Sequence, residues 1–493
     1  MTVTNRIFLL CAILMFAGCS IAMAQSFAGY HTSHYAGIYG VLSNPASAAG
    51  TRYRWDVNII GADGKAGNTY VKYPKSLLFN IPDTFRKNQD FFLDTSAKRK
   101  QNGWEMAEIL MPSVMYSIDE RQTVSFIWRI RSSANGGPLS TEQANFFGNS
   151  FPNAAYTGRN YTIEHAAVSA HAWNEFGFSY ARVIKETYSG VWKAGITLKY
   201  LGGIAAGYAA VDNATFGLNT RRDATIYSGT LKYGYNEQAD HWQSPAISNL
   251  KLFENPGIGA DIGVIYEYRP DNDGFGKYSG DHWNPGADEY KLRLGLAITD
   301  IGGIGYTKSK TNTDLNLTKD HINPNALTYR KNESLQQYAR RLNSYFTPID
   351  SNDHFFMALP TTLQLSGDYN IDGRFFVSAN AAIALNGGQH SLAKTYALTL
   401  FQITPRYDTD IFGAYLPFVI NRNGQADLGA GIRIGPLLIG STSIFTNLLR
   451  HKVDHADAFV ALRVIPIHFK RGGGSGGGIF HMRKKQLGCP VNN

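Results

Sequence analysis

The chain has 493 residues and a formal net charge of +9, and charged residues make up 17% of it, against about 25% in typical soluble domains. After the first two dozen residues, no segment reaches the ~18 consecutive apolar residues that a membrane-spanning helix requires. Length and composition therefore exclude an α-helical membrane protein. They favour a closed β-barrel, the other structure that satisfies every backbone polar group within lipid.

Residues 1–24 have the pattern of a cleaved secretory signal peptide. One arginine precedes an apolar stretch, and Ala22 and Ala24 provide the small side chains that signal peptidase accepts. A second interpretation stays open, in which Cys19 is acylated and becomes the mature N-terminus. Cleavage after Ala24 leaves Cys489 as the single cysteine, so we expect no intramolecular disulfide in the exported chain.

Beyond residue 51, many segments alternate between apolar and polar or small side chains, as transmembrane strands do. In residues 192–200, tryptophan, isoleucine and leucine occupy one face, and lysine, glycine and threonine occupy the other. Residues 290–300 repeat this design. Charges in such strands would destabilise a dry core but suit a wet lumen. The charged residues on the predicted lumen faces are Lys193, Lys199, Asp261, Glu267, Lys291, Arg293, Arg433 and Arg463.

The lengths of these segments match the roughly 9–11 residues that a tilted strand needs to cross a bilayer. We therefore predict an all-β fold, a transmembrane antiparallel β-barrel of about 14 strands over residues 52–469. A soluble β-sandwich or propeller would also alternate, but it explains neither the lipid-length strands nor the aromatic residues at their ends. A short helix is predicted at 334–345. Outer loops are expected at 75–105, 133–170, 236–256, 270–288 and 303–354.

Residues 470–493 differ in composition from the predicted barrel. A glycine-rich linker leads to a basic segment that contains histidine, arginine and lysine. We predict a periplasmic tail that contacts a partner or anionic lipid head groups. The glycine run also resembles an engineered linker, so whether the tail is native stays open.

The segment 35–47, ahead of the first predicted strand, contains Asn44-Pro45-Ala46. This element resembles the N-terminal hatch region of the long-chain fatty-acid transporter (FadL) and PorV superfamily. More closely, the chain resembles a group of outer-membrane proteins known only as a domain of unknown function. The segments that carry the closer resemblance are 52–61, 193–203, 290–302, 405–407 and 431–440.

The resemblance implies a barrel of about fourteen strands whose residues 25–51 fold into the lumen as a hatch or plug, with Asn44, Pro45 and Ala46 in it. In FadL-type transporters this hatch gates a hydrophobic ligand. In the PorV-like branch the barrel serves protein secretion and surface attachment.

No catalytic pattern is present: the His-x-Ser-x-Asn arrangement of outer-membrane phospholipase is absent, so we expect no enzyme. Histidines and carboxylates could bind a divalent ion, but solvated turns collect the same residues, so we expect no metal and no other cofactor. Basic residues are spread over separate strands, which excludes a nucleic-acid platform. The metal candidates that were weighed are His31, His34, His451, Asp454, His455 and Asp457.

Two functions are consistent with the sequence. The first is a channel or transporter for hydrophobic or small ligands, integral to the outer membrane of a Gram-negative-type envelope. The alternative is a non-enzymatic scaffold or accessory subunit of a secretion or assembly complex. The expected partners are outer-membrane lipid, a hydrophobic ligand and proteins of an envelope complex. A continuous apolar cavity behind the hatch would favour transport, and a filled lumen would favour a scaffold.

Overall fold

The computed structural model describes residues 27, 29–78, 85–95, 99–148, 154–240, 253–270, 290–330, 333–349, 352–386, 393–464 and 466–468. The predicted signal peptide at 1–24, with Cys19, lies outside the described residues. The predicted tail at 470–493, with Cys489, lies outside them too.

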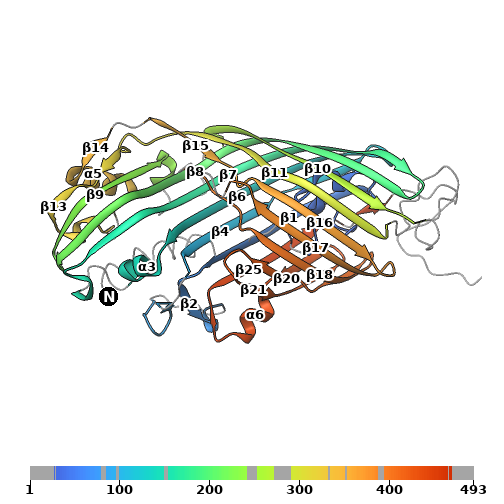
Figure 1. Ribbon diagram of the computed structural model, residues 1–493. Helices are drawn as coiled ribbons and strands as arrows, with labels where there is room; N and C mark the ends of the chain where they lie inside the picture. Colours follow the sequence, from blue (N-terminus) through green and yellow to red (C-terminus); the bar gives the residue numbers. More distant parts are fainter. Residues whose placement is uncertain are drawn as a thin grey trace, which may run out of the picture.

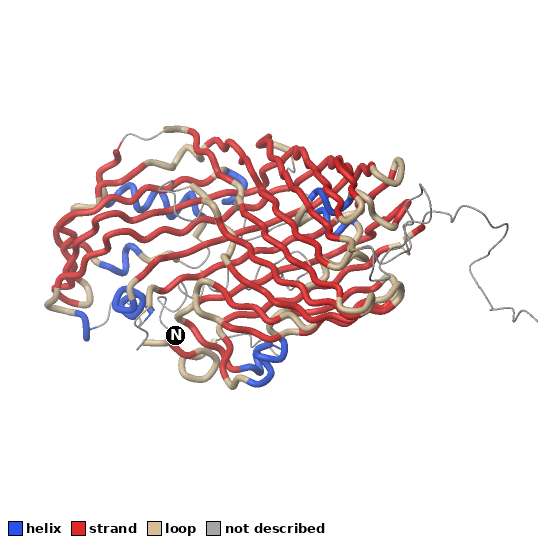
Figure 2. The backbone as a smooth tube through the Cα atoms, turned by 45° about the vertical axis from the view of Figure 1, so that its right-hand side comes forward, coloured by secondary structure: helices blue, strands red, loops and turns tan. Residues whose placement is uncertain are grey.

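The described strands form a closed 14-strand antiparallel barrel, which confirms the predicted all-β fold (Figures 1 and 2). Several wall strands are interrupted, so two labelled segments follow each other along one wall position. The wall strands in chain order are β1 (Tyr53–Asn68), β4 (Gln101–Leu110) with β5 (Ser113–Ser117), β6 (Gln122–Leu139), β7 (Asn160–Thr187), β8 (Gly190–Thr220), β9 (Asp223–Tyr235) with β10 (Asn255–Tyr268), β11 (Leu292–Thr307), β15 (His354–Ala358) with β16 (Thr362–Asn370), β17 (Phe375–Ala384), β18 (Leu400–Asp408), β19 (Phe412–Tyr415) with β20 (Phe418–Asn421), β21 (Ala426–Leu428) with β22 (Ala430–Ile434), β23 (Leu437–Ser441), and β25 (His455–Arg463) with β26 (Ile467–His468).

The barrel closes because its first and last strands pair with each other. Asn58 of β1 lies opposite Arg463 of β25, and β1 pairs on its other edge with β4 and β5. Closure removes the two free edges that an open sheet would leave with unsatisfied backbone groups.

Strand alternation separates an apolar outer face from a polar inner face. In β8, the Leu198 side chain is 60% exposed, whereas the neighbouring Lys199 is 4% exposed. The same parity exposes Ile196 and Trp192 and buries Lys193. Since side chains point to opposite faces of a sheet with period two, the predicted lumen face of this strand is the inner face of the wall.

The two ends of the barrel differ in the length of their connections. One end, which we call the short-turn end, carries tight turns at 118–121, 188–189, 371–374, 409–411 and 435–436. At the other end, which we call the long-loop end, the long strands β7 and β8 extend far along the barrel. The helix α5 lies there, near β9, β13 and β14 (Figure 1). Among the described residues, no helix is long and apolar enough to cross a membrane.

Smaller elements connect the wall strands or fold inside the wall. They are α2 (Ile38–Val41), η1 (Pro45–Ala48), β2 (Val71–Pro74), η2 (Lys75–Leu78), β3 (Phe92–Leu93), α3 (Thr141–Gly148), η3 (Ala154–Tyr156), α4 (Glu237–Asp240), β12 (Asp314–Asn316), β13 (Lys319–Ile322), η6 (Pro324–Leu327), α5 (Leu335–Tyr345), β14 (Thr347–Ile349), α6 (Ile444–Leu449) and β24 (Lys452–Val453).

Two of the predicted outer loops, 236–256 and 270–288, lie mostly outside the described residues, but their described flanks show where they join the wall. The segment 270–288 follows Tyr268, which pairs with Gly190 at the short-turn end. The segment 236–256 interrupts one wall position, because β9 and β10 pair with successive parts of β8. There, Asn236 replaces ladder hydrogen bonds: its amide donates to the Ile204 carbonyl and its oxygen accepts from Ala206 N–H. Successive antiparallel strands end alternately at the two ends of the barrel, so the end at which a loop lies depends on the number of strands before it. Local composition does not encode that number.

The predicted short helix is present as α5, packed on the long-loop end. Ser334 caps its N-terminus in a reciprocal capping box with Gln337. Arg341 binds the Glu333 carboxylate through two hydrogen bonds of 2.7 Å. The Tyr233 hydroxyl of β9 donates to Asn343 at 2.9 Å, which ties the helix to the wall.

The contact with Arg341 predicts a pH-dependent helix. Hydrogen bonding to Arg341 lowers the pKa of Glu333 below its ordinary value of 4.5. A carboxylate with a depressed pKa stabilises the fold above its unfolded pKa, and that stabilisation is lost as the pH falls through the folded pKa. The protection factors of amides 335–345 against hydrogen exchange, which correct for the slower intrinsic exchange in acid, should fall on acidification below pH 4.5. Glu333→Gln should show the lower protection already at neutral pH. If protection in this variant still fell with acid as it does in the parent protein, the assignment would be contradicted.

Candidate functional site

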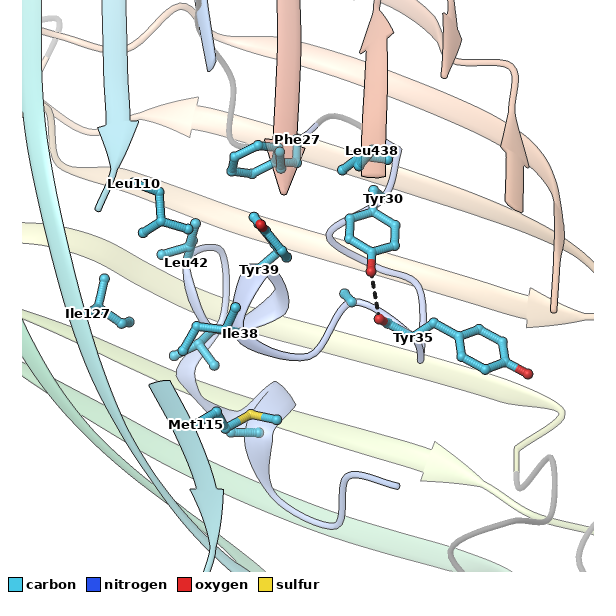
Figure 3. Packing of buried hydrophobic residues seen from close by; sticks show 14 of the residues in the cluster. Phe27, Tyr30, Tyr35, Ile38, Tyr39, Leu42, Leu110, Met115, Ile127 and Leu438 are labelled. Atoms are coloured by element: carbon cyan, nitrogen blue, oxygen red, sulfur yellow. Dashed lines mark hydrogen bonds between the residues drawn. The ribbon is translucent and has the colours of Figure 1, made fainter. Parts of the chain in front are cut away.

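The first described residues, up to Thr51, lie inside the short-turn half of the barrel, and we call them the N-terminal segment. Figure 3 shows how its apolar side chains pack against those of the wall. Its Phe27 and Tyr39 share one buried apolar cluster with Leu110 and Phe459 of the wall. The Phe27 ring meets the Tyr39 ring edge-on, with 4.5 Å between centroids. Apolar burial contributes about 25 cal/mol per Å² removed from water, so the segment forms part of the protein's core.

Asn44 attaches the segment to two adjacent wall strands. Its side-chain amide donates to the Val264 carbonyl of β10 at 3.2 Å and to the Leu296 carbonyl of β11 at 3.4 Å. Its side-chain oxygen accepts from Ala46 N–H at 3.0 Å, which starts the short η1 helix at Pro45. Asn44 therefore caps η1 and also donates hydrogen bonds to two backbone carbonyls of the wall.

Glycines on the inner wall make this close approach possible. A Cβ at Gly195 of β8 would lie 2.5 Å from Ala46 N, and a Cβ at Gly263 of β10 would overlap the Asn44 side-chain oxygen. Both distances are too short for any side chain. Gly195 and Gly263 thus form a notch in the wall that receives Asn44 and Ala46; we call it the glycine notch.

Wall carboxylates accept hydrogen bonds from the N-terminal segment. The Asp56 carboxylate of β1 accepts from Ile38 N–H at 2.8 Å. Asp63 accepts from Phe27 N–H, and Asp408 accepts from the Ser33 hydroxyl. The segment is therefore held by hydrogen bonds to wall carboxylates as well as by apolar packing.

Arg433 and Arg463, both predicted on the lumen face, are buried beside this segment. Arg463 donates to the Tyr35 carbonyl at 3.1 Å and lies 3.4 Å from Asp56. Arg433 donates to Asp408 at 3.0 Å. Each of these arginines faces a carboxylate that also binds the segment, so wall and segment share one polar network.

A second set of charges lies deeper in the lumen, and we call it the central ion cluster. Arg131 of β6 binds Asp300 of β11 through hydrogen bonds of 2.7 and 2.9 Å. Strands β7, β8 and β10 lie between β6 and β11, so this pair crosses the lumen. The predicted residues Lys199 and Asp261 belong to it, 2.6 Å apart. The full cluster is Glu108, Arg129, Arg131, Glu175, Lys199, Asp261 and Asp300.

The connection between β17 and β18 also crosses the lumen. Its Tyr396 exchanges two hydrogen bonds with the Asn135 side chain of β6, of 3.0 and 2.8 Å. Thr395 and Ala397 beside it are buried. We call residues 393–399 the inner strap. The described part of the lumen is thus occupied by the N-terminal segment, the central ion cluster and the inner strap.

The predicted residues Lys193, Glu267 and Arg293 come together near the short-turn end. The Lys193 ammonium lies 2.6 Å from the Glu267 carboxylate, and Arg269 contacts the same carboxylate at 2.5 Å. Arg293 is farther away, with its Nε 3.7 Å from Glu267. These side chains adjoin Gly50 of the N-terminal segment, where an added Cβ would lie 3.4 Å from the Lys193 Nζ.

Lys291 does not lie on the lumen face where it was predicted. Its ammonium lies 5.2 Å from the centre of the Tyr369 ring, whose side chain is outward and exposed, and it donates to the Ile371 carbonyl at the turn. Tyr290 points inward instead and donates to Asp368 at 2.6 Å. The alternation is reversed here because the regular strand begins only at Leu292.

Most of the acidic partners in the lumen were not predicted from the sequence. Glu108, Glu175 and Asp300 were not among the predicted charges, although Glu175 lies directly opposite Arg129 in the ladder of β6 and β7. Assigning the register of this hairpin would have found that pair.

The metal candidate His455 lies 2.8 Å from Asp427 and 2.6 Å from Asp454. The described residues hold no group of three or more metal-type side chains in binding geometry.

The glycine notch gives a test of how the segment is held. Gly263→Ala should displace Asn44, because the new methyl group overlaps its side-chain oxygen, while the barrel still folds. Limited proteolysis should then cut within residues 27–51 faster than in the parent protein. Gly367→Ala is the matched control, since a Cβ there meets its nearest atom at 3.7 Å. Equal cleavage of both variants would refute the role of the notch.

The central ion cluster gives a stability test. Asp300→Asn should leave Arg131 and Lys199 without a full counter-charge in a buried site. Removing one partner of a buried ion pair costs about 3–5 kcal/mol of unfolding free energy. Urea unfolding of the barrel in lipid vesicles measures it. Asp353→Asn, on the exposed surface, should stay within about 0.5 kcal/mol of the parent.

Comparisons with known proteins find one family model and several solved structures. The Pseudomonas putida toluene transporter TodX matches with 12% identity over 91% of this chain and 99% of its own, at a TM-score of 0.40. The Ralstonia pickettii toluene transporter TbuX matches with 11% identity over 88% and 94%, at 0.37. A Pseudomonas aeruginosa FadL homologue matches with 10% identity over 90% and 99%, at 0.23. No curated protein matches. The family model covers residues 45–441 and includes the segments that carried the closer resemblance, so the chain belongs to the family described as "Family of unknown function (DUF5723)".

Proposed function

We propose that the protein is an integral outer-membrane β-barrel that works as a gated channel or transporter for small ligands, with residues 25–51 as its plug. The observation that carries the proposal is the way the N-terminal segment is held. It lies inside a closed wall, joined to it by hydrogen bonds and packing that can separate without breaking a covalent bond. A removable occupant of a barrel lumen is what gating requires.

The outer face supports the placement in lipid. Large apolar side chains on it are exposed on many strands, for example Ile258 at 77% and Leu198 at 60%. Exposed apolar area on this scale would be unfavourable in water but is matched to a bilayer. Export by the predicted signal peptide, residues 1–24, and short turns at the end where β1 begins and β26 ends agree with this placement.

The polarity of the lumen bears on the ligand. Buried arginines, lysines and carboxylates line the path on the short-turn side of the inner strap. Such a path supports a small or polar solute there. An apolar cluster at the long-loop end, which includes Phe146, Tyr161 and Leu342, is the feature that a hydrophobic ligand would contact first.

The gating proposal predicts that removal of the N-terminal segment opens the barrel and that release of the inner strap widens the path. Deleting residues 27–51 should convert a barrel without resolvable conductance into one with discrete conductance steps in planar bilayers. Adding Asn135→Ala should enlarge the steps, because Asn135 holds the inner strap across the lumen. Heat-modifiable migration in gels checks that each variant forms a barrel. Folded deletion variants that conduct no more than the parent would sink the channel proposal.

A scaffold or accessory role is the second candidate, and the filled lumen favours it. The central ion cluster and the inner strap occupy the lumen independently of the N-terminal segment. In this case the double variant stays closed, and affinity purification in native detergent recovers a stoichiometric envelope protein with the barrel. Recovery of the barrel alone would remove this candidate.

A further inference from the structure

We propose that a cavity between the N-terminal segment and the wall binds a small oxyanion, of the phosphate or carboxylate type, and that the bound anion locks the segment to the wall. The cavity measures about 40 Å³, room for a few ordered water molecules or one compact ion. Most of its lining comes from the N-terminal segment, including Ser47, and the rest comes from Arg52 at the junction with β1 and from the wall, including Lys193 and Arg293.

The charge balance of the lining favours an anion. Lys193, Arg293 and Arg52 line the cavity, and Glu267 is the one carboxylate among the lining residues. Glu267 is already engaged by Lys193 at 2.6 Å and by Arg269 at 2.5 Å. Arg293 therefore faces the cavity with no carboxylate at hydrogen-bond distance among the described residues.

Arg293 has the geometry of an anion ligand. Its Nε lies 3.7 Å from Glu267, beyond hydrogen-bond distance, and its side chain is 11% exposed. Its other contact among the described residues is the Tyr290 ring, at 5.9 Å. The two terminal guanidinium nitrogens are thus available as a fork, and a guanidinium fork matches the two oxygens of a phosphate or carboxylate.

Hydrogen-bond donors complete the site from the segment. The Ser47 hydroxyl is buried at the cavity and has no hydrogen-bond partner among the described residues. A buried hydroxyl without a partner is unfavourable, and an anion oxygen would satisfy it. Arg52 also lines the cavity and pairs with Asp410 at 3.4 Å.

An anion bound in this cavity contacts the N-terminal segment and the barrel wall at the same time. Ser47 and Arg52 belong to the N-terminal segment or its junction with β1, whereas Lys193 and Arg293 belong to β8 and β11. Occupancy therefore favours the docked segment by mass action. The locking role rests on the proposed plugging function; the binding itself does not.

The test uses the full-length protein in detergent and inorganic phosphate as the probe, titrated by calorimetry at constant ionic strength set with chloride. The parent should bind one phosphate saturably. Arg293→Gln should weaken binding about tenfold or more, as expected for loss of a charge-assisted hydrogen bond. Ser47→Ala keeps the charge and should weaken binding less. Arg121→Gln, at an exposed turn of the same end, should bind as the parent does.

Absence of saturable binding in the parent, or equal affinities in Arg293→Gln and Arg121→Gln, would overturn the site. The lock has its own readout: phosphate should slow hydrogen exchange in residues 27–51 of the parent but not of Arg293→Gln. Binding without that protection would refute the lock and keep the site. Because neither measurement depends on conductance, failure of the channel proposal remains distinguishable from failure of this one.

Discussion

Pairing of the first wall strand with the last is the constraint on which the rest of the molecule depends. Within lipid, backbone groups find no water, so each must bond to another strand, and only a closed ladder achieves this for all of them. Closure forces alternate side chains inward along every strand. The inward positions then carry the charged residues, because charged side chains are unfavourable on the lipid-facing side of the wall. The polar lumen is a consequence of closure.

Charges confined to such a lumen must be paired, and the pairs shape what occupies it. Arg131 and Asp300 meet across the lumen, and Arg463 meets Asp56 beside the N-terminal segment. Breaking either pair would leave a buried charge, which is far more costly than leaving a surface charge unpaired. The segment and the inner strap therefore rest on a pre-formed framework of paired charges. Movement of the segment exchanges its own hydrogen bonds for water and leaves most of that framework in place.

The sequence was informative where the physics is local. Alternation along residues 192–200 placed Lys193 and Lys199 on the inner face, and closure as a barrel followed from lipid-length strands without helices. It failed where the physics is distant. The partners Arg131 and Asp300 are 169 residues apart, and no local pattern encodes the register that brings them together. Lys291 was misplaced for a related reason, since the alternation holds only where the ladder of β11 has begun. Gly195 and Gly263 follow the ordinary strand alternation, and only their contacts with Ala46 and Asn44 show that they form a notch.

The N-terminal segment also touches both sides of the seam where the barrel closes. Tyr39 bonds to Asn58 of β1, and Phe27 packs against Phe459 of β25. These two strands come from opposite ends of the chain, and joining them demands the largest loss of chain entropy in the fold. A segment that binds both is a template for assembly, because it holds the first strand in a form that the last can recognise. Its loss would then slow insertion into the membrane as well as vacate the short-turn half of the lumen.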